Sequence, residues 1–167
     1  MLKGKAFKFG DSISTDHIIP GRLLHLRSNL PELAKHVLED ANSTFAQRVR
    51  KGDYVVGGKN FGLGSSREHA PLVIKMAGVS AVLAKSVARI FFRNAINVGL
   101  PVLVCDTDSI NDGNELEIDL QLGKIHDLTK GTKLSFVPIP KIMLNILNEG
   151  GLIPYIKKYK DFVVPRT

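Results

Sequence analysis

One segment of the sequence, Gly57 to Pro71, combines residue types that bind and activate small anions. It reads GGKNFGLGSSREHAP, with glycines first, then two serines, an arginine and a glutamate. Gly62 and Gly64 permit positive φ and a close approach of the backbone to a ligand. The helix expected next offers unpaired N–H groups and the positive end of its dipole. Because Arg67 adds a planar fork that matches a carboxylate, the segment predicts an anion site that modestly favours carboxylate over phosphate.

Common nucleotide and nucleophile motifs do not match this segment. GxGxxG would need glycine where Arg67 stands, the P-loop would need Gly-Lys-Ser/Thr, and GxSxG is absent at either serine. Dinucleotides and ATP are therefore disfavoured. A structural alternative remains open, because Ser65 followed three places later by Glu68 has the spacing of a helix capping box.

The periodicity of the sequence predicts an α/β core. Apolar runs bounded by turn residues alternate with segments of helical spacing from residue 53 to 105, and that order requires parallel crossover connections. Residues 11–29 are expected to form a long loop, and Ser86 is expected to cap the helix that follows it. We expect strands over 4–10, 53–58, 79–84, 100–105, 114–120, 123–128 and 132–138, and helices over 30–40, 43–52, 67–78, 86–99 and 140–151.

Length and composition limit the class of protein. The 167 residues suit one domain over 1–167, and the apolar runs are too short to cross a bilayer. The N-terminus lacks the apolar stretch of a signal peptide, so we expect a cytoplasmic protein without a membrane partner. The formal charge of +7 suits an acidic partner or a polyanionic substrate, whereas no nucleic-acid-binding motif is found. Cys105 is the only cysteine, which excludes an internal disulfide and a cluster held by this chain's cysteines alone.

Three long motifs resemble those of a known superfamily. GxGSSREHA spans Gly62–Ala70, DSISTDHIIP spans Asp11–Pro20, and AKSVARIFFRNAINVGLP spans Ala84–Pro101. With the order of strands and helices, they resemble the swivelling domain of the aconitase superfamily, as found in the separate small subunits of isopropylmalate dehydratase and homoaconitase. The resemblance implies a single swivelling β/β/α domain like the mobile domain of aconitase, with a parallel βαβ core, short C-terminal strands and a helix.

The same resemblance implies a hydro-lyase that moves water within a malate-like acid. It implies the interconversion of 2-isopropylmalate and 3-isopropylmalate in leucine biosynthesis, with homoaconitate in lysine biosynthesis, or both acids, as the alternative. No cofactor is expected on this chain, and a [4Fe–4S] cluster is expected on a large partner subunit. A homo-oligomer remains open when the chain is alone. A carboxylate-binding regulatory module is the non-enzyme alternative, which has no need of Ser65, Arg67 and Asp16 together.

The family pattern also assigns roles to individual residues. Ser65 would take the proton next to a carboxylate, and Arg67 would hold a substrate carboxylate. Asp16 would orient Ser65 or the substrate, although without the resemblance it reads as a cap or turn residue, and His17 as structural. The remaining candidates are Ser66 and Thr15 at the substrate, and Gly62, Gly64 and Glu68 in the shape and cap of the loop.

Substrate choice is assigned by the resemblance to the segment PGRLLHLRSN, residues 20–29. Leu24 and Leu26 would contact an isopropyl group, whereas Arg27 would contact a distal carboxylate. Arg22 is expected to be a surface arginine. Arg89 and Arg93 share one helical face, which predicts a solvated stripe or, alternatively, an interface with the large subunit. Neither the histidines nor the acidic segment 106–115 has the spacing of a metal site.

Overall fold

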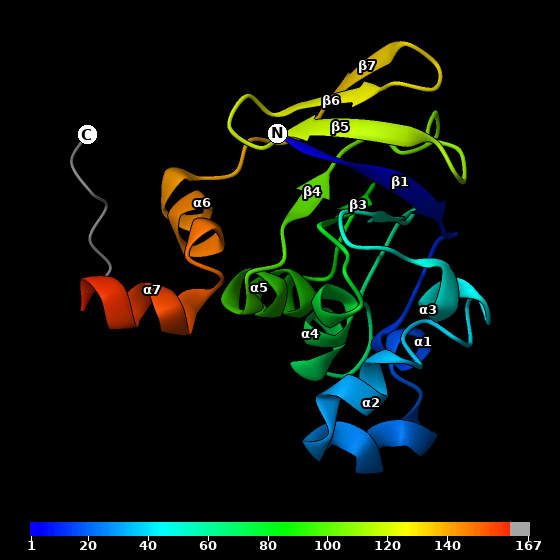
Figure 1. Ribbon diagram of the computed structural model, residues 1–167, viewed down its shortest axis with the longest axis vertical. Helices are drawn as coiled ribbons and strands as arrows, with labels where there is room; N and C mark the ends of the chain where they lie inside the picture. Colours follow the sequence, from blue (N-terminus) through cyan, green and yellow to red (C-terminus); the bar gives the residue numbers. More distant parts are fainter. Residues whose placement is uncertain (161–167) are drawn as a thin grey trace.

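Residues 1–160, which are the residues described by the computed structural model, fold around a seven-stranded sheet of order β4-β3-β2-β1-β5-β6-β7 (Figure 1). β1 to β4 pair in parallel, whereas β5 pairs antiparallel with β1 and continues through β6 to β7. The predicted α/β class, with its parallel core and short C-terminal strands, is confirmed. The strands are β1 (Leu2–Lys8), β2 (Tyr54–Val56), β3 (Ala81–Ala84), β4 (Val102–Val104), β5 (Glu115–Asp119), β6 (Lys124–Asp127) and β7 (Thr132–Ser135).

The helices agree with the expected order but not with every expected boundary. Two crossover helices, α4 (His69–Met76) and α5 (Arg89–Val98), connect β2 to β3 and β3 to β4 as predicted. The other helices are α1 (Thr15–Ile18), the 3₁₀ helix η1 (Gly21–Ser28), α2 (Leu30–Ala34), α3 (Phe45–Arg48), α6 (Lys141–Asn148) and α7 (Leu152–Tyr159).

Three expectations about helices were wrong. Residues 11–29 do not form a long loop, because α1 and η1 occupy most of that stretch. The helix expected over 30–40 ends at Ala34, and Leu38 has a φ of 58°, which no α-helical residue adopts. Beyond the predicted C-terminal helix there is a second one, α7, in which Pro154 occupies the first turn, where its missing N–H costs nothing.

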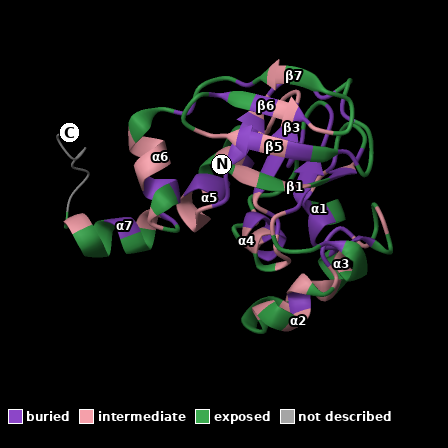
Figure 2. Ribbon diagram, turned by 45° about the horizontal axis from the view of Figure 1, so that its top comes forward, coloured by how far each residue is buried: buried purple, intermediate pink, exposed green. Residues whose placement is uncertain are grey.

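The parallel strands are buried on both faces. Side chains alternate between two apolar clusters, so that along β3 Ala81 and Leu83 join one cluster and Val82 and Ala84 join the other. One cluster lies beneath α2, α3 and α4, and the other is covered by β5 to β7 together with α6 and α7 (Figures 1 and 2). This two-sided burial explains why these strands read as near-continuous apolar runs. Among residues 1–160, no helix has both the length and the apolar character that crossing a bilayer requires.

The topology brings three connecting segments to one edge of the sheet. Because β1, β2 and β3 are parallel neighbours, the residues that follow each of them emerge at the same side. Those segments contain Thr15 and Asp16 after β1, Ser65 and Arg67 after β2, and Arg89 after β3. In open α/β sheets this carboxyl edge is where ligands bind.

Tyr54 in β2 provides a test of the packing. Its side chain is fully buried, and its hydroxyl has no hydrogen-bond partner among residues 1–160. An unpaired buried hydroxyl costs about 1–3 kcal/mol, so we expect Tyr54→Phe to raise the free energy of unfolding by about 1 kcal/mol in denaturant titrations. Tyr159→Phe is the matched control, because the Tyr159 hydroxyl donates to Glu149 and its removal stabilises nothing. Destabilisation of the protein by Tyr54→Phe would contradict this account.

Candidate active site

The loop from Gly57 to Arg67 is hydrogen-bonded to the segment that follows β1. The Gly62 N–H donates to the Ile13 carbonyl at 2.7 Å, and the Thr15 N–H donates to the Leu63 carbonyl at 2.8 Å. These bonds form an isolated parallel bridge between Ser14 and Leu63, outside the main strands. The loop is therefore held in register with the residues that carry Thr15 and Asp16.

The other side of the loop is bonded to the segment that follows β3. The Phe61 N–H donates to the Ser86 carbonyl at 3.0 Å, and the Phe61 carbonyl accepts from Ala88 at 2.9 Å. The Ser86 hydroxyl oxygen accepts from the Asn60 N–H at 2.8 Å. The prediction that Ser86 caps a helix was therefore wrong: α5 has Ala88 as its N-cap, and the Ser86 side chain is engaged by the loop instead.

The two glycines of the loop adopt conformations that other residues rarely adopt. Gly62 has a φ of 77° and Gly64 a φ of 109°. A Cβ atom at Gly62 would lie 2.3 Å from Cγ of Phe91, and one at Gly64 would lie 3.1 Å from Oγ1 of Thr15. The predicted positive φ is confirmed, and the close approach that the glycines allow is to Phe91 of α5 and Thr15 of α1.

Ser65 lies at the exposed tip of this loop. Its carbonyl oxygen accepts a hydrogen bond from the Thr15 hydroxyl at 3.0 Å, which fixes the backbone at the serine. The N–H groups of Ser65, Ser66 and Arg67 donate no hydrogen bond to any group in residues 1–160. Successive unpaired N–H groups ahead of a helix form a positive surface suited to an anion.

Arg67 and Asp16 connect the two motifs by an ion pair. Nη1 of Arg67 lies 3.0 Å from Oδ1 of Asp16 and donates to the Ile19 carbonyl at 2.6 Å. The Gly21 N–H also donates to Oδ1 of Asp16, at 3.0 Å. The Arg67 hydrogen bond, followed by that from Gly21, lowers the pKa of Asp16, so the carboxylate stays ionised to lower pH than usual. Arg67 is mostly buried, with its side chain 19% exposed, and Asp16 holds it in place.

Arg67 and the tip of the loop border a cavity of about 330 Å³ at the carboxyl edge of the sheet. The loop forms one wall, Thr15 contributes from α1, and the first turns of α5 form the opposite wall. Its lining residues are Thr15, Gly62, Gly64, Ser65, Ser66, Arg67, Ala88, Arg89, Ile90, Phe91 and Asn94. The cavity contains a hydroxyl at its rim, a guanidinium and unpaired N–H groups, which together can bind a carboxylate and stabilise an oxyanion.

The capping box that the sequence offered as an alternative at Ser65 and Glu68 is not formed. α4 begins at His69, and Glu68 is itself the N-cap, in helical conformation and without a side-chain cap bond. Because the backbone bonds described above hold the loop away from α4, Ser65 lies three residues before the N-cap and does not cap the helix. A reciprocal cap exists instead at α1, where Nδ1 of His17 accepts from the Ser14 N–H at 2.9 Å and the Ser14 hydroxyl accepts from the His17 N–H at 3.1 Å. The structural interpretation of His17 is thus confirmed.

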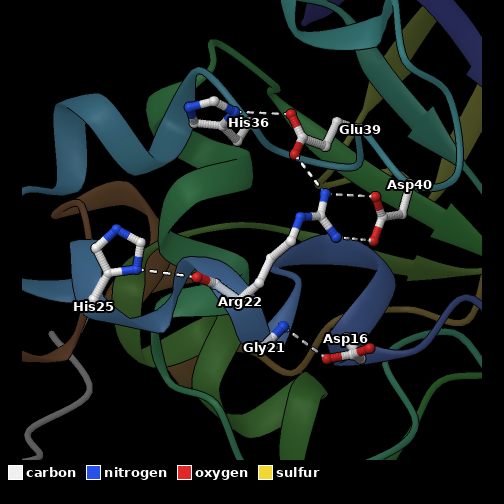
Figure 3. Close-up of polar contacts among 7 residues, drawn as sticks. All are labelled: Asp16, Gly21, Arg22, His25, His36, Glu39 and Asp40. Carbon is white, nitrogen blue, oxygen red and sulfur yellow. Dashed lines mark hydrogen bonds and ion pairs between the residues drawn. The ribbon is translucent and has the colours of Figure 1, made fainter.

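The segment 20–29 is anchored by Arg22. Figure 3 shows its guanidinium between two acidic side chains, with Asp40 at 2.8 and 2.9 Å and Glu39 at 2.8 Å. The Arg22 side chain is 57% exposed, in agreement with the expected surface position. The ion pairs join η1 to the turn that follows α2.

The predicted selectivity residues lie outside the cavity lining in residues 1–160. Leu24 and Leu26 are half-buried and pack against the chain's own apolar cluster beneath the sheet. Arg27 is exposed and has no hydrogen-bond or ion-pair partner in the described part of the chain. The structure therefore groups Thr15, Asp16, Ser65, Ser66 and Arg67, but it does not group Leu24, Leu26 and Arg27 with them.

Five residues of the cavity lining were not assigned to the site from the sequence, namely Ala88, Arg89, Ile90, Phe91 and Asn94. The available signal was topological, because the helix after β3 must begin at the same edge as the loop after β2. Arg89 was expected only as part of a solvated stripe or an interface, and Asn94 had no distinguishing spacing.

This chain does not have the donor set of an iron–sulfur site. The single cysteine, Cys105, is buried, and burial raises its pKa to about 11, so its thiol is neutral at physiological pH. Residues 1–160 contain no group of three or more His, Cys, Asp or Glu side chains arranged to hold a metal ion. A cluster, where one is required, has to be held by another chain.

Comparison with known proteins extends the likeness to nearly the whole chain. Residues 28–107 match the family described as the aconitase C-terminal domain. Small subunit 2 of 3-isopropylmalate dehydratase from Archaeoglobus fulgidus is 65% identical over 163 residues, which are 98% of this chain and 99% of that protein. Small subunit 1 of the enzyme from Thermotoga maritima is 62% identical, over 97% of this chain and 98% of that protein.

A solved structure shows the same fold. The crystal structure of a 3-isopropylmalate dehydratase from Methanocaldococcus jannaschii matches this chain with a TM-score of 0.91 and 46% sequence identity. The match covers 95% of this chain and 95% of the other. The strand order and the placement of the helices are therefore shared with a protein of that description.

Gly62 allows a test of how tightly the loop must pass over α5. Gly62→Ala places a Cβ against Phe91 at positive φ, whereas Gly113→Ala adds a Cβ at a φ of 80° with open space around it. The left-handed conformation alone costs about 1–2 kcal/mol, so we expect about this loss at Gly113 and a clearly larger loss at Gly62 in the free energy of unfolding. Equal losses for the two variants would show that the loop yields and that the close approach does not matter.

Proposed function

Since the chain belongs to the family of 3-isopropylmalate dehydratase small subunits, we propose that it is one half of a hydro-lyase that interconverts 2-isopropylmalate and 3-isopropylmalate. The resemblance read from the motifs is confirmed by relatives that are 54–65% identical over nearly the full chain. The observation that carries the proposed activity is the meeting of Ser65 and Arg67 at one cavity, with Asp16 from a separate motif ion-paired to Arg67.

Ser65 is the proposed base that removes the proton from the carbon next to a substrate carboxylate. A free serine hydroxyl is far too weak a base at neutral pH, so its alkoxide has to be stabilised. The unpaired N–H groups of Ser66 and Arg67 and the nearby guanidinium supply positive charge at the loop tip. In the return step the same hydroxyl gives the proton back to the neighbouring carbon, and water is added with hydrogen and hydroxyl exchanged.

Arg67 is the proposed binding residue for a substrate carboxylate. Its Nη1 is already engaged by Asp16 and the Ile19 carbonyl, which leaves the remaining N–H groups of the fork for the substrate. Asp16 is proposed to act through Arg67, because it orients the guanidinium before the substrate arrives. Ser66 and Thr15 complete the wall on which the carboxylate is placed.

The large subunit is the proposed partner, because the relatives are named as small subunits of 3-isopropylmalate dehydratase. A [4Fe–4S] cluster held by that partner would supply the Lewis acid that withdraws the substrate hydroxyl. Neither Cys105 nor any other donor group in residues 1–160 suits the cluster, so this chain supplies the proton-transfer and carboxylate-binding groups alone. The complete enzyme would therefore consist of both chains.

The test of the proposed function is reconstitution. The purified chain is mixed with the iron–sulfur large subunit, and turnover of 3-isopropylmalate is measured with and without each component. We expect neither chain alone to turn over the substrate, and the mixture to be active. Turnover by this chain without its partner would overturn the two-subunit proposal.

Ser65→Ala in the reconstituted enzyme tests the role of the hydroxyl. Loss of a general base lowers the rate by about a hundredfold or more, so kcat should fall by at least that factor while the melting temperature stays unchanged. Glu68→Ala is the control on the same loop, and it should keep both rate and stability because Glu68 makes no cap bond. Full kcat in the Ser65→Ala enzyme would contradict the proposal that Ser65 transfers the proton.

Arg27→Ala tests the proposed selectivity of segment 20–29. Arg27 is exposed and lies outside the cavity lining, and the family resemblance implies that it contacts a distal carboxylate, which homoaconitate has and isopropylmalate lacks. We expect kcat/KM to fall about tenfold for homoaconitate, on the order of 1.4 kcal/mol, and little for 3-isopropylmalate. Arg22→Ala is the comparison, and it should affect the two acids equally because Arg22 anchors the segment. Equal losses of kcat/KM for the two acids in Arg27→Ala would show that Arg27 anchors the segment and does not select the substrate.

A further inference from the structure

A second cavity, the α5–α6 groove, lies beside the first and has a different character. It has a volume of about 500 Å³ and runs between α5 and α6, with Val104 of β4 and Leu152 of α7 also in its lining. Its walls are mostly apolar, with Phe92 and Ile96 on one side and Ile142 and Met143 on the other. Figure 1 shows α6 and α7 next to α5, on the side of the molecule away from α2 and α3. No part of residues 1–160 fills this groove.

The groove adjoins the cavity lined by Ser65 and Arg67, which is called the catalytic cavity below. Arg89 lines both, and its neighbours Val87 and Ala88 line one each. A chain that closes the catalytic cavity over Ser65 therefore meets Arg89 and reaches the edge of the groove. This step rests on the proposed function, because it requires that a partner supplies the missing half of the active site.

The charges around the groove favour one kind of occupant. Arg89 and Arg93 are exposed, and neither has an acidic partner among residues 1–160. No carboxylate lies among the lining residues, and the chain has a formal charge of +7. In a symmetric pair formed through this groove, each copy would bring its own two arginines into the contact and no lining carboxylate to pair with them, and like charges brought together cost several kcal/mol. An acidic partner has the opposite, favourable arrangement.

We propose that the α5–α6 groove is the docking site for an apolar segment of the large subunit, flanked by carboxylates that pair with Arg89 and Arg93. The apolar side chains of the partner segment bury the walls formed by Phe92 and Met143, and the carboxylates fix its position relative to the catalytic cavity. This surface accounts for the arginine stripe on α5 as an interface instead of a solvated face.

Arg93→Glu is the main test, because Arg93 lines the groove but not the catalytic cavity. Lys133→Glu on β7 is the matched control, an exposed lysine without an ion-pair partner in residues 1–160 that undergoes the same change in charge. Association with the large subunit is measured by titration calorimetry, and the fold of each variant is checked by its thermal melt. We expect Arg93→Glu to weaken the affinity about tenfold or more, and Lys133→Glu to change it by less than about twofold.

A second variant tests the apolar wall. Met143→Asp places a carboxylate at the half-buried rim of the groove and should also weaken association, without a change in kcat once the large subunit is added to saturation. Wild-type affinity in both variants, when each is folded, would overturn the docking site. Unchanged binding to the large subunit together with altered sedimentation of the chain alone would assign the groove to a second copy and would also overturn it.

The docking site and the proposed function fail in different ways. If the wild-type chain and the large subunit associate but turn over no isopropylmalate, the proposed function fails while the effect of Arg93→Glu on association stays measurable. If the wild-type mixture is active and Arg93→Glu binds and reacts as the wild type does, only the docking site fails.

Discussion

The arrangement of the candidate active site depends on one constraint, which is that the loop after β2 bonds through its backbone to the segments after both neighbouring strands. Gly62 bonds to Ile13 on one side, and Phe61 bonds to Ser86 and Ala88 on the other. These bonds exist only because β1, β2 and β3 are parallel neighbours that end at the same edge. Backbone bonds also leave the side chains of the loop free, so Ser65 and Arg67 remain available for chemistry.

The Arg67–Asp16 pair adds electrostatic order to this backbone frame. Asp16 has a lowered pKa because Arg67 and then Gly21 donate hydrogen bonds to it. A lowered carboxyl pKa means that the pair is complete above the ordinary pKa of an aspartate and is lost only as the pH falls through the lowered value. Throughout the neutral range the guanidinium is therefore held in one orientation, and orienting a binding group in advance reduces what the substrate must order.

The sequence predicted the sheet for a physical reason that the structure bears out, whereas the grouping of the main site residues was implied by the family resemblance. Buried parallel strands need continuous apolar runs, and their shared carboxyl edge brought Asp16 and Arg67 together. The helix starts were harder to predict, since Ser65 and Ser86 both have the spacing of caps but are displaced from that role by long-range backbone bonds of the loop. α7 was not predicted because Gly150, Gly151 and Pro154 are typical of the end of a helix. A proline in the first turn is nevertheless compatible with a new helix. The place of Arg89 and Asn94 depends on how α5 packs against the loop, which local spacing does not encode.

The burial of Cys105 has a consequence for the sensitivity of the chain to oxidants. Peroxides and disulfides react with thiolates, and a buried thiol with a pKa near 11 supplies almost none at neutral pH. The folded chain thus presents no reactive thiol, so reagents directed at thiols should leave it unmodified until it unfolds.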